Sequence, residues 1–480
     1  MTGAARAIAS QGLKRRALSL GAVKTFDHAM QFLLPVVLVR CLDAATFGEY
    51  RLLWLAVGTV MAFAALNMPG SLYFFVPRSE PRKRRAYVHN TLLYLALAGL
   101  VCGMALSPWN PVLPATMEPL EPYGALVPAF VGVWIAAMLL DCLPTIDEQI
   151  GWQAAATIGI ALLRTTLVAA GAWASGELEV VLWLLLAAAL LKLALLLAYV
   201  QRRHGLGRPW FERAAFSEQF RHAAPFGLSN ALYVMRGQAD QWVAASRFAL
   251  SSFAAFSIAA IVSQVVLVFR HAVVEAFLPS MSRMQATGDM RGMMDMNARG
   301  NALVATALFP LLAFAFAFAE DIVAFVYTGA YLEAAPAMRV YIVGMVALVV
   351  EVGSVVLLLR QGVFTLWLTA FALVISVAVS LMAAQQFGLA GAAAGSVCTI
   401  YLDRAILLRR VAALTGIPLG RLQRWRELAR ALLLSALAAG IAWALVERFL
   451  GSGSGLLRLV AGAAVIAAIC GPSSLRRLRA

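Results

Sequence analysis

Long apolar stretches, separated by short polar segments, repeat along the whole chain. Each stretch approaches or exceeds the roughly 20 mostly apolar residues that an α-helix needs to cross the hydrocarbon core of a bilayer. The pattern predicts about fourteen membrane-spanning helices, near residues 17–39, 50–76, 87–107, 123–143, 153–174, 179–200, 222–246, 253–278, 299–319, 334–358, 362–384, 389–411, 428–446 and 456–471.

The first predicted span carries a polar stripe. Lys24, Asp27, His28 and Gln31 recur at i, i+3, i+4 and i+7, so a helix places them on one face. A charge near the membrane centre costs about 2.5–3.5 kcal/mol on insertion scales, so this face should point to protein or to a watery cavity. The sequence leaves two interpretations open: a Lys24–Asp27 pair that only joins helices, or a functional site.

The seventh predicted span repeats this arrangement. Ser229, Tyr233, Arg236 and Asp240 share one helical face, so a second basic–acidic pair is expected there. Two halves that each begin with a charged helix suggest an internal repeat of the kind found in alternating-access transporters.

Other predicted spans also contain ionisable residues. The candidates for a functional site are Arg164 in the fifth span, Arg270, His271 and Glu275 in the eighth, and Glu351 in the tenth. Lys192 in the sixth span lies close enough to the cytoplasmic end to reach the interface, so it is interpreted as a membrane anchor.

Composition agrees with a polytopic membrane protein. Of the 480 residues, 62% are hydrophobic and only 13% are charged, whereas soluble proteins are close to half apolar. The net charge of +15 comes from basic loops that alternate with acidic or neutral loops. The positive-inside rule accounts for this excess without nucleic acid as a partner, and it predicts that both termini are cytoplasmic.

Known catalytic and cofactor motifs are missing from the sequence. The five cysteines show no CxxC and no metal-ligand spacing, and we find no Walker A motif, HExxH or G-x-S-x-G elbow. We therefore expect neither an enzyme nor a bound cofactor.

A series of short motifs follows the spans in order. The first is R-x-L-x-x-x-x-F-G-x-Y, from Arg40 to Tyr50. The others are residues 71–78, 236–240, 279–282, 325–331 and 387–393. Together they resemble polysaccharide flippases of the multidrug/oligosaccharidyl-lipid/polysaccharide (MOP) superfamily, over residues 17–411.

This resemblance implies an all-α polytopic membrane protein with two six-helix lobes around a central cavity and two further helices. The expected divisions are residues 1–211, 212–411 and 412–480. The implied activity moves an undecaprenyl-diphosphate-linked oligosaccharide from the cytoplasmic to the periplasmic leaflet of the bacterial inner membrane. It would serve exopolysaccharide, O-antigen or capsule assembly, beside glycosyltransferases and a polymerase of the same pathway.

The polar residues of the spans divide into two expected roles. Basic side chains suit the anionic diphosphate, because charge-assisted hydrogen bonds recognise phosphate oxygens: Lys24, Arg164, Arg236 and Arg270. The remaining residues would hold these cations apart or bind a coupling proton or sodium ion: Asp27, His28, Asp240, His271, Glu275 and Glu351.

Three alternatives remain at this point. A lipid II flippase or a drug/cation antiporter would use the same fold, although the excess of arginine in the spans disfavours the antiporter. A membrane enzyme such as a polymerase or acyltransferase would need a long external loop or a catalytic pair, and the longest external segment, near residues 108–122, is short and proline-rich.

Overall fold

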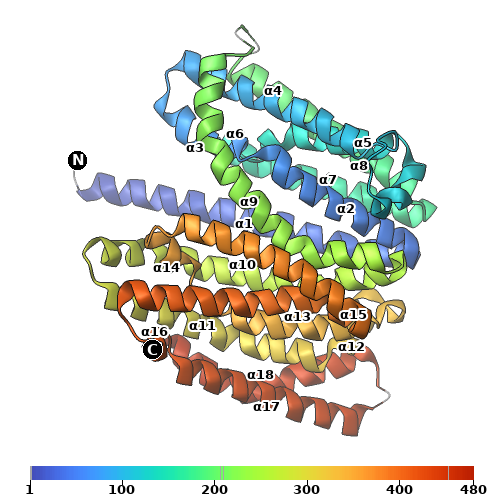
Figure 1. Ribbon diagram of the computed structural model, residues 1–480, viewed down its shortest axis with the longest axis vertical. Coiled ribbons are helices and arrows are strands. Elements are labelled where there is room, and N and C mark those ends of the chain that lie inside the picture. The colour runs from blue at the N-terminus through green and yellow to red at the C-terminus, as the bar shows by residue number, and fades with distance from the viewer. Residues whose placement is uncertain (1–2, 206, 209, 452, 480) are drawn as a thin grey trace. The chain divides into compact units, whose positions relative to one another are not determined.

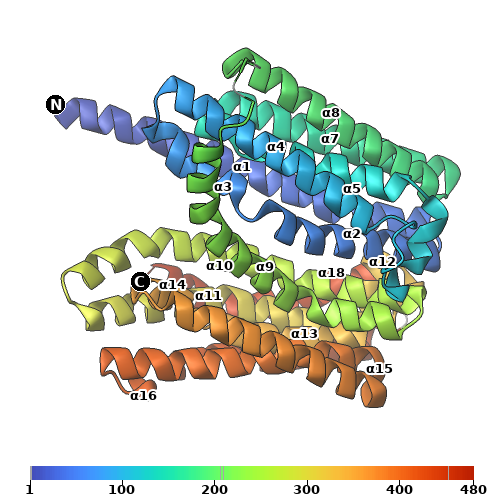
Figure 2. The same ribbon diagram turned by 45° about the horizontal axis from the view of Figure 1, so that its top comes forward.

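The computed structural model describes residues 3–205, 207–208, 210–451 and 453–479. Within these ranges, the described side chains are those outside residues 3–20, 24, 262, 264–265, 268–269, 271–273, 275–276 and 472–479. The described chain is built from helices and the turns between them, and it divides into two compact units, Met1–Val234 and Met235–Ala480 (Figures 1 and 2).

The first unit contains six predicted spans. Its helices are α1 (Gly3–Cys41), α2 (Ala44–Ala65), α3 (Met68–Phe75), α4 (Pro81–Ala105), α5 (Leu126–Ala136), α6 (Leu143–Ile146), α7 (Ile150–Ser175) and α8 (Leu178–Arg203), with short 3-10 segments η1 (Val76–Arg78), η2 (Ala115–Tyr123) and η3 (Ala137–Asp141). Helix α1 packs on α7, α4 on α5, and α8 on both α5 and α7. The long α9 (Arg213–Arg247) continues from this unit into the next.

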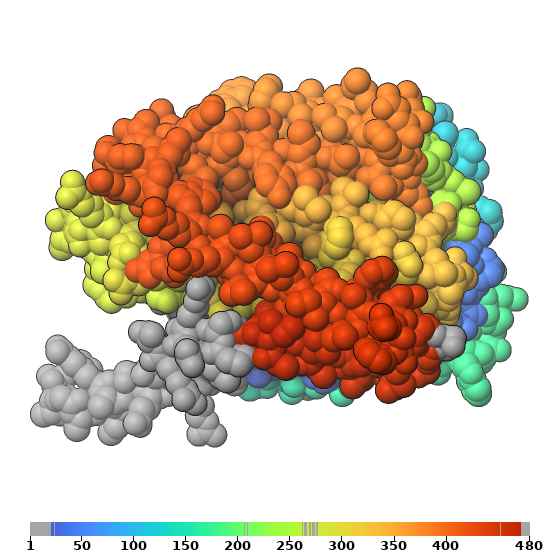
Figure 3. Space-filling model, turned by 90° about the horizontal axis from the view of Figure 1, so that it is seen from below, coloured from blue at the N-terminus to red at the C-terminus, as the bar shows by residue number. Residues whose placement is uncertain are grey.

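The second unit holds the remaining helices. They are α10 (Leu250–Ala286), α11 (Met290–Ala317), α12 (Ala319–Tyr327), η4 (Gly329–Tyr331), α13 (Ala334–Leu348), α14 (Gly353–Leu358), α15 (Gly362–Thr415), α16 (Leu419–Leu422), α17 (Trp425–Leu450) and α18 (Gly455–Arg479). Helix α11 packs against α10, α17 and α18, and α13 packs against α10 and α15. Figure 3 looks onto the face of this unit where α15 is orange and α17 is red.

Helical segments cover each of the fourteen predicted spans. Within the described residues, eight helices are long and apolar enough to cross a membrane, or nine when the bent pair α2 and α3 counts as one span. The remaining predicted spans fall on the more polar α9 and on helices whose described apolar stretches are shorter, Leu250–Ile261, Ala334–Leu348 and Gly455–Gly471. The prediction of an all-helical polytopic membrane fold is confirmed.

Two helical segments are interrupted at residues with positive φ angles. Helix α2 ends before Leu66 and Asn67, which take φ values of 37° and 57°, and α3 then leaves at an angle of 41°. The second break is at Gly388 in α15, with φ 59° and ψ −138°, a conformation that glycine adopts readily. This residue separates the predicted eleventh and twelfth spans.

Small residues allow the two halves of α15 to pack closely. A Cβ added to Gly391 would collide with the carbonyl oxygen of Ala383, and one added to Gly395 would collide with that of Ser376. Gly391 and Gly395 thus act as a small-xxx-small packing motif.

Candidate functional site

A cavity of about 440 Å³ lies within the first unit. Its walls come from regular stripes on two helices. Helix α7 supplies residues at spacings of three and four, namely Gln153, Ala156, Thr157, Ile160, Ala161 and Arg164. Helix α2 supplies a second stripe, namely Tyr50, Arg51, Trp54, Val57, Gly58 and Met61. Spacings of three and four keep each set on one helical face, so both faces look into the same space.

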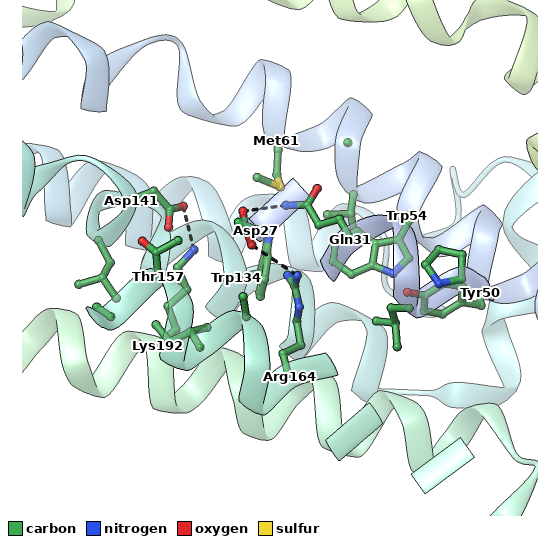
Figure 4. A pocket seen from close by; sticks show the side chains of 18 of the residues that line it. Asp27, Gln31, Tyr50, Trp54, Met61, Trp134, Asp141, Thr157, Arg164 and Lys192 are labelled. Atoms are coloured by element: carbon green, nitrogen blue, oxygen red, sulfur yellow. Dashed lines mark hydrogen bonds and ion pairs between the residues drawn. The ribbon is translucent and has the colours of Figure 1, made fainter. Parts of the chain in front are cut away.

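Charged side chains from three other elements complete the cavity (Figure 4). Asp27 comes from α1, Asp141 from the end of η3, and Lys192 from α8. The Lys192 ammonium lies 2.8 Å from Asp141 Oδ2 and 4.7 Å from the centre of the Trp134 ring. The Lys192 side chain is only 7% exposed.

The sequence-based interpretation of Lys192 as a membrane anchor is wrong. An anchor would extend to the interface, whereas this side chain is buried against Asp141 and Trp134. The 3-10 helix η3 brings Asp141 to Lys192, and the apolar sequence around Asp141 did not indicate this partner.

Asp27 and Arg164 form the second charged group of the cavity. Arg164 Nη2 lies 3.9 Å from Asp27 Oδ1, and Gln31 Nε2 donates to Asp27 Oδ2 at 2.9 Å. The Arg164 guanidinium also lies 5.6 Å from the Trp134 ring centre, so both cations contact the same indole. The structure therefore brings Asp27, Gln31 and Arg164 together.

The other two residues of the first stripe differ in what the structure describes of them. The Lys24 side chain lies outside the described residues. His28 is exposed and is not part of the cavity lining. The pairing of Lys24 with Asp27 stays a prediction.

A second polar group lies within the second unit. Arg236 Nη1 is 3.2 Å from Asp403 Oδ1, and Nη2 donates to the carbonyl oxygen of Thr399 at 3.3 Å. Asp240, which is 1% exposed, accepts from the Tyr341 hydroxyl. The expected pair between Arg236 and Asp240 is thus replaced by partners on α15 and α13.

Arg270 and Glu351 lie at the break between α13 and α14. Arg270 is 8% exposed and its Nη1 points to the carbonyl oxygen of Leu348 at 3.5 Å. Glu351 caps α14, because its carboxylate accepts from the backbone N–H and the hydroxyl of Ser354 at 3.1 and 2.6 Å. The side chains of His271 and Glu275 lie outside the described residues.

Several polar residues of these groups escaped the sequence reasoning. In the cavity they are Asp141, Gln153 and Thr157, and in the second unit they are Asp403 and Arg404. Asp403 and Arg404 form an acidic–basic dipeptide inside the twelfth predicted span, and this dipeptide could have identified them from the sequence. Among the described side chains, no group of three or more His, Cys, Asp or Glu is placed to hold a metal ion.

Comparison with known proteins agrees with this architecture. Residues 151–336 match the family described as "Polysaccharide biosynthesis protein". No curated protein matches the chain.

Solved structures share the fold at low sequence identity. The lipid II flippase MurJ, in an inward closed conformation, has a TM-score of 0.70 at 10% identity, over 96% of this chain and 99% of that one. The Vibrio cholerae MATE transporter VcmN has a TM-score of 0.53 at 13% identity, over 86% and 98%. A MOP superfamily transporter from Pyrococcus furiosus has a TM-score of 0.53 at 14% identity, over 84% and 96%.

The chain therefore shares its all-helical, multi-pass membrane fold with a lipid II flippase and with MATE transporters. The chain has the fold of the MOP superfamily, and its central part matches a polysaccharide biosynthesis family. The resemblance found in the sequence motifs is therefore confirmed.

Proposed function

We propose that this protein flips an undecaprenyl-diphosphate-linked oligosaccharide across the bacterial inner membrane, from the cytoplasmic to the periplasmic leaflet. The product would enter exopolysaccharide, O-antigen or capsule assembly. Both termini are proposed to be cytoplasmic. The proposed divisions are an N-lobe of residues 1–211, a C-lobe of residues 212–411 and a C-terminal helix pair of residues 412–480.

The observation that carries the proposal is the polar cavity of the first unit. Asp27, Arg164 and Lys192 all lie within segments that are otherwise apolar and long enough to span a bilayer. Ionisable groups at such positions are costly, and in transporters they line substrate or ion paths. A hydrophilic head group crossing a membrane needs such a lining, whereas its lipid chain can remain in the bilayer.

The charges suggest which residues meet the head group. Substrate contacts are proposed for Lys24, Arg164, Arg236 and Arg270, with Arg404 added by the structure. In the second unit, the charges that act on Arg404 are those of Arg236 and Arg270 and of two carboxylates, Asp403 and Glu351, while the third buried carboxylate, Asp240, is hydrogen-bonded to Tyr341. This excess of positive charge favours recognition of the diphosphate by Arg236, Arg270 and Arg404.

Alternating access is proposed to be coupled to a proton or a sodium ion. Asp27, whose carboxylate lines the cavity, is the main candidate among the described side chains. Asp240 and Glu351 are buried acidic groups with hydrogen-bond partners, and they are proposed to take part in gating. His28, His271 and Glu275 remain candidates for the same roles.

Complementation in cells tests the proposal. We expect a strain that lacks this gene to accumulate the lipid-linked oligosaccharide and to stop exporting polymer, and the wild-type chain to restore export. An Arg270→Ala chain that reaches the membrane at normal abundance should restore at most about a tenth of export, because loss of a charge-assisted contact of about 1.5–3 kcal/mol costs tenfold or more. Unchanged export in the deletion strain would contradict the proposal.

A lipid II flippase is the second candidate, favoured by the shared fold with MurJ over nearly the whole chain. Depletion would then stop cell-wall synthesis and growth, not only polymer export. A drug/cation antiporter on the same fold would instead transport cationic dyes, and a dye-accumulation assay in the deletion strain distinguishes it.

A further inference from the structure

Each of the two most buried cations in the first-unit cavity already has a carboxylate partner. Lys192 pairs with Asp141 at 2.8 Å, and Arg164 lies 3.9 Å from Asp27. The third cation of the lining, Arg51, is also engaged by a neighbour. A diphosphate entering here would meet two carboxylates and would have to displace them, so the cavity is poorly suited to a strong anion.

Unpartnered buried atoms indicate what the cavity accepts instead. Gln153 is 5% exposed and donates from Nε2 to Thr157 Oγ1 at 3.1 Å, while its Oε1 has no partner. Arg164 is 7% exposed and its Nε has no partner. Buried polar atoms are seldom left unsatisfied, so a ligand with both donors and acceptors is expected.

The rest of the lining fits a ring with polar edges and apolar faces. Tyr50, Trp54 and Trp134 provide aromatic surface, with the two indoles packed edge to face at 5.8 Å. The Asp141 side chain is 61% exposed, so its carboxylate can accept from a hydroxyl as well as from Lys192. A volume of about 440 Å³ lies within the roughly 300–1,000 Å³ of small-molecule sites and is too small for a long glycan.

We infer that the cavity of the first unit is a binding site for a sugar ring of the transported glycan and excludes the diphosphate. Hydroxyl groups both donate and accept, which matches the free acceptor of Gln153 and the free donor of Arg164. The paired carboxylates reject anions while they offer acceptors to hydroxyls. This inference rests on the proposed function and assigns glycan selection to the first unit.

Ligand binding to the purified full chain in nanodiscs tests this. Methyl glycosides of glucose, galactose, mannose and N-acetylglucosamine are titrated by saturation-transfer NMR, which detects weak binding. At least one glycoside should bind saturably, and inorganic diphosphate should not compete with it. Absence of binding by all four, or competition by diphosphate, would overturn the inference.

Matched variants place the binding in the cavity. Gln153→Leu and, as a second variant, Thr157→Val should each weaken the glycoside at least fivefold. The controls Gln201→Leu and Thr166→Val change exposed residues on α8 and α7 and should leave binding unchanged. If either cavity variant binds like the wild type, or the controls lose binding equally, the site lies elsewhere.

Neutralising the carboxylates should reverse the selectivity. In the double variant Asp27→Asn with Asp141→Asn, Arg164 and Lys192 lose their counter-charges, so inorganic diphosphate should bind and displace the glycoside. A double variant that still ignores diphosphate would show that these carboxylates do not exclude anions.

Transport separates failure of this inference from failure of the proposed function. If cells export polymer through the wild-type chain and equally well through Gln153→Leu, only the sugar site is refuted. If the deletion strain exports polymer normally, the proposed flippase function is refuted.

Discussion

The ion pair between Arg236 and Asp403 allows structural and functional roles to be separated by a double-mutant cycle. Both side chains are buried, with 14% and 11% exposed, and the closest N–O distance is 3.2 Å. The pair joins α9 to the second half of α15. At an effective dielectric constant of about 20, the gross attraction is about 5 kcal/mol, and desolvation of both charges offsets most of it.

The single and double variants should behave differently. Asp403→Leu leaves Arg236 buried with only the Thr399 carbonyl as acceptor, so it should lower the free energy of unfolding by about 3 kcal/mol. Arg236→Met should cost a similar amount. The double variant should cost about 1 kcal/mol or less, because two apolar side chains replace a buried pair at little net cost.

Unfolding of the purified chain in mixed micelles measures these free energies, and polymer export measures the function. We expect a coupling energy of about 5 kcal/mol, the difference between the double variant and the two single variants taken together, with the double variant stable but inactive in export. A coupling energy near zero would refute the assignment of the pair as a buried contact. A double variant that exports like the wild type would show that Arg236 acts only in structure.

Three further predictions concern topology and stability. In a chain without native cysteines, Glu118→Cys should react with an impermeant thiol reagent in intact cells and Lys83→Cys should not, and the opposite result would reverse the orientation. Asp43→Ala removes the N-cap of α2 and should cost about 1 kcal/mol of unfolding free energy. Hydrogen bonds from the Thr46 backbone and hydroxyl lower the pKa of Asp43. The loss of unfolding free energy in Asp43→Ala should therefore be complete above about pH 5 and shrink as the pH falls below about 4. A loss that stays constant with pH would contradict the cap. Gly99→Val would drive a side chain into a backbone carbonyl of α5, so the melting temperature should fall by several degrees. The control Gly159→Val, at a helical glycine where an added Cβ meets nothing within 4 Å, should change it far less, and an equal fall in both would contradict the close approach.

The positions of the helices could be predicted because the bilayer imposes a length and an apolar composition on every span. The backbone breaks also have a signal in the sequence, since Asn67 and Pro69 interrupt an apolar run and Gly388 lies between two such runs. Hydrophobicity determines where a helix lies in sequence. It does not determine which face meets which neighbour.

The partners of the buried charges show this limit. Arg236 and Asp240 are four residues apart, which suggested a mutual pair, yet each is paired across to a different helix. Lys192 was misjudged because its partner, Asp141, lies 51 positions earlier in sequence and reaches it only through the turn at η3. Pairing between helices depends on how they pack, and the spacing of residues within one helix does not indicate it.

The most direct test of the central claim is the rate at which the purified chain moves lipid-linked oligosaccharide across a membrane. Proteoliposomes carry the undecaprenyl-diphosphate-linked oligosaccharide in both leaflets, and an impermeant glycosidase digests the outer pool. With the wild-type chain, digestion should proceed past the outer pool towards completion, whereas Arg270→Ala proteoliposomes should resemble protein-free liposomes. Digestion that stops at the outer pool with the wild-type chain, under an imposed proton or sodium gradient, would contradict the account.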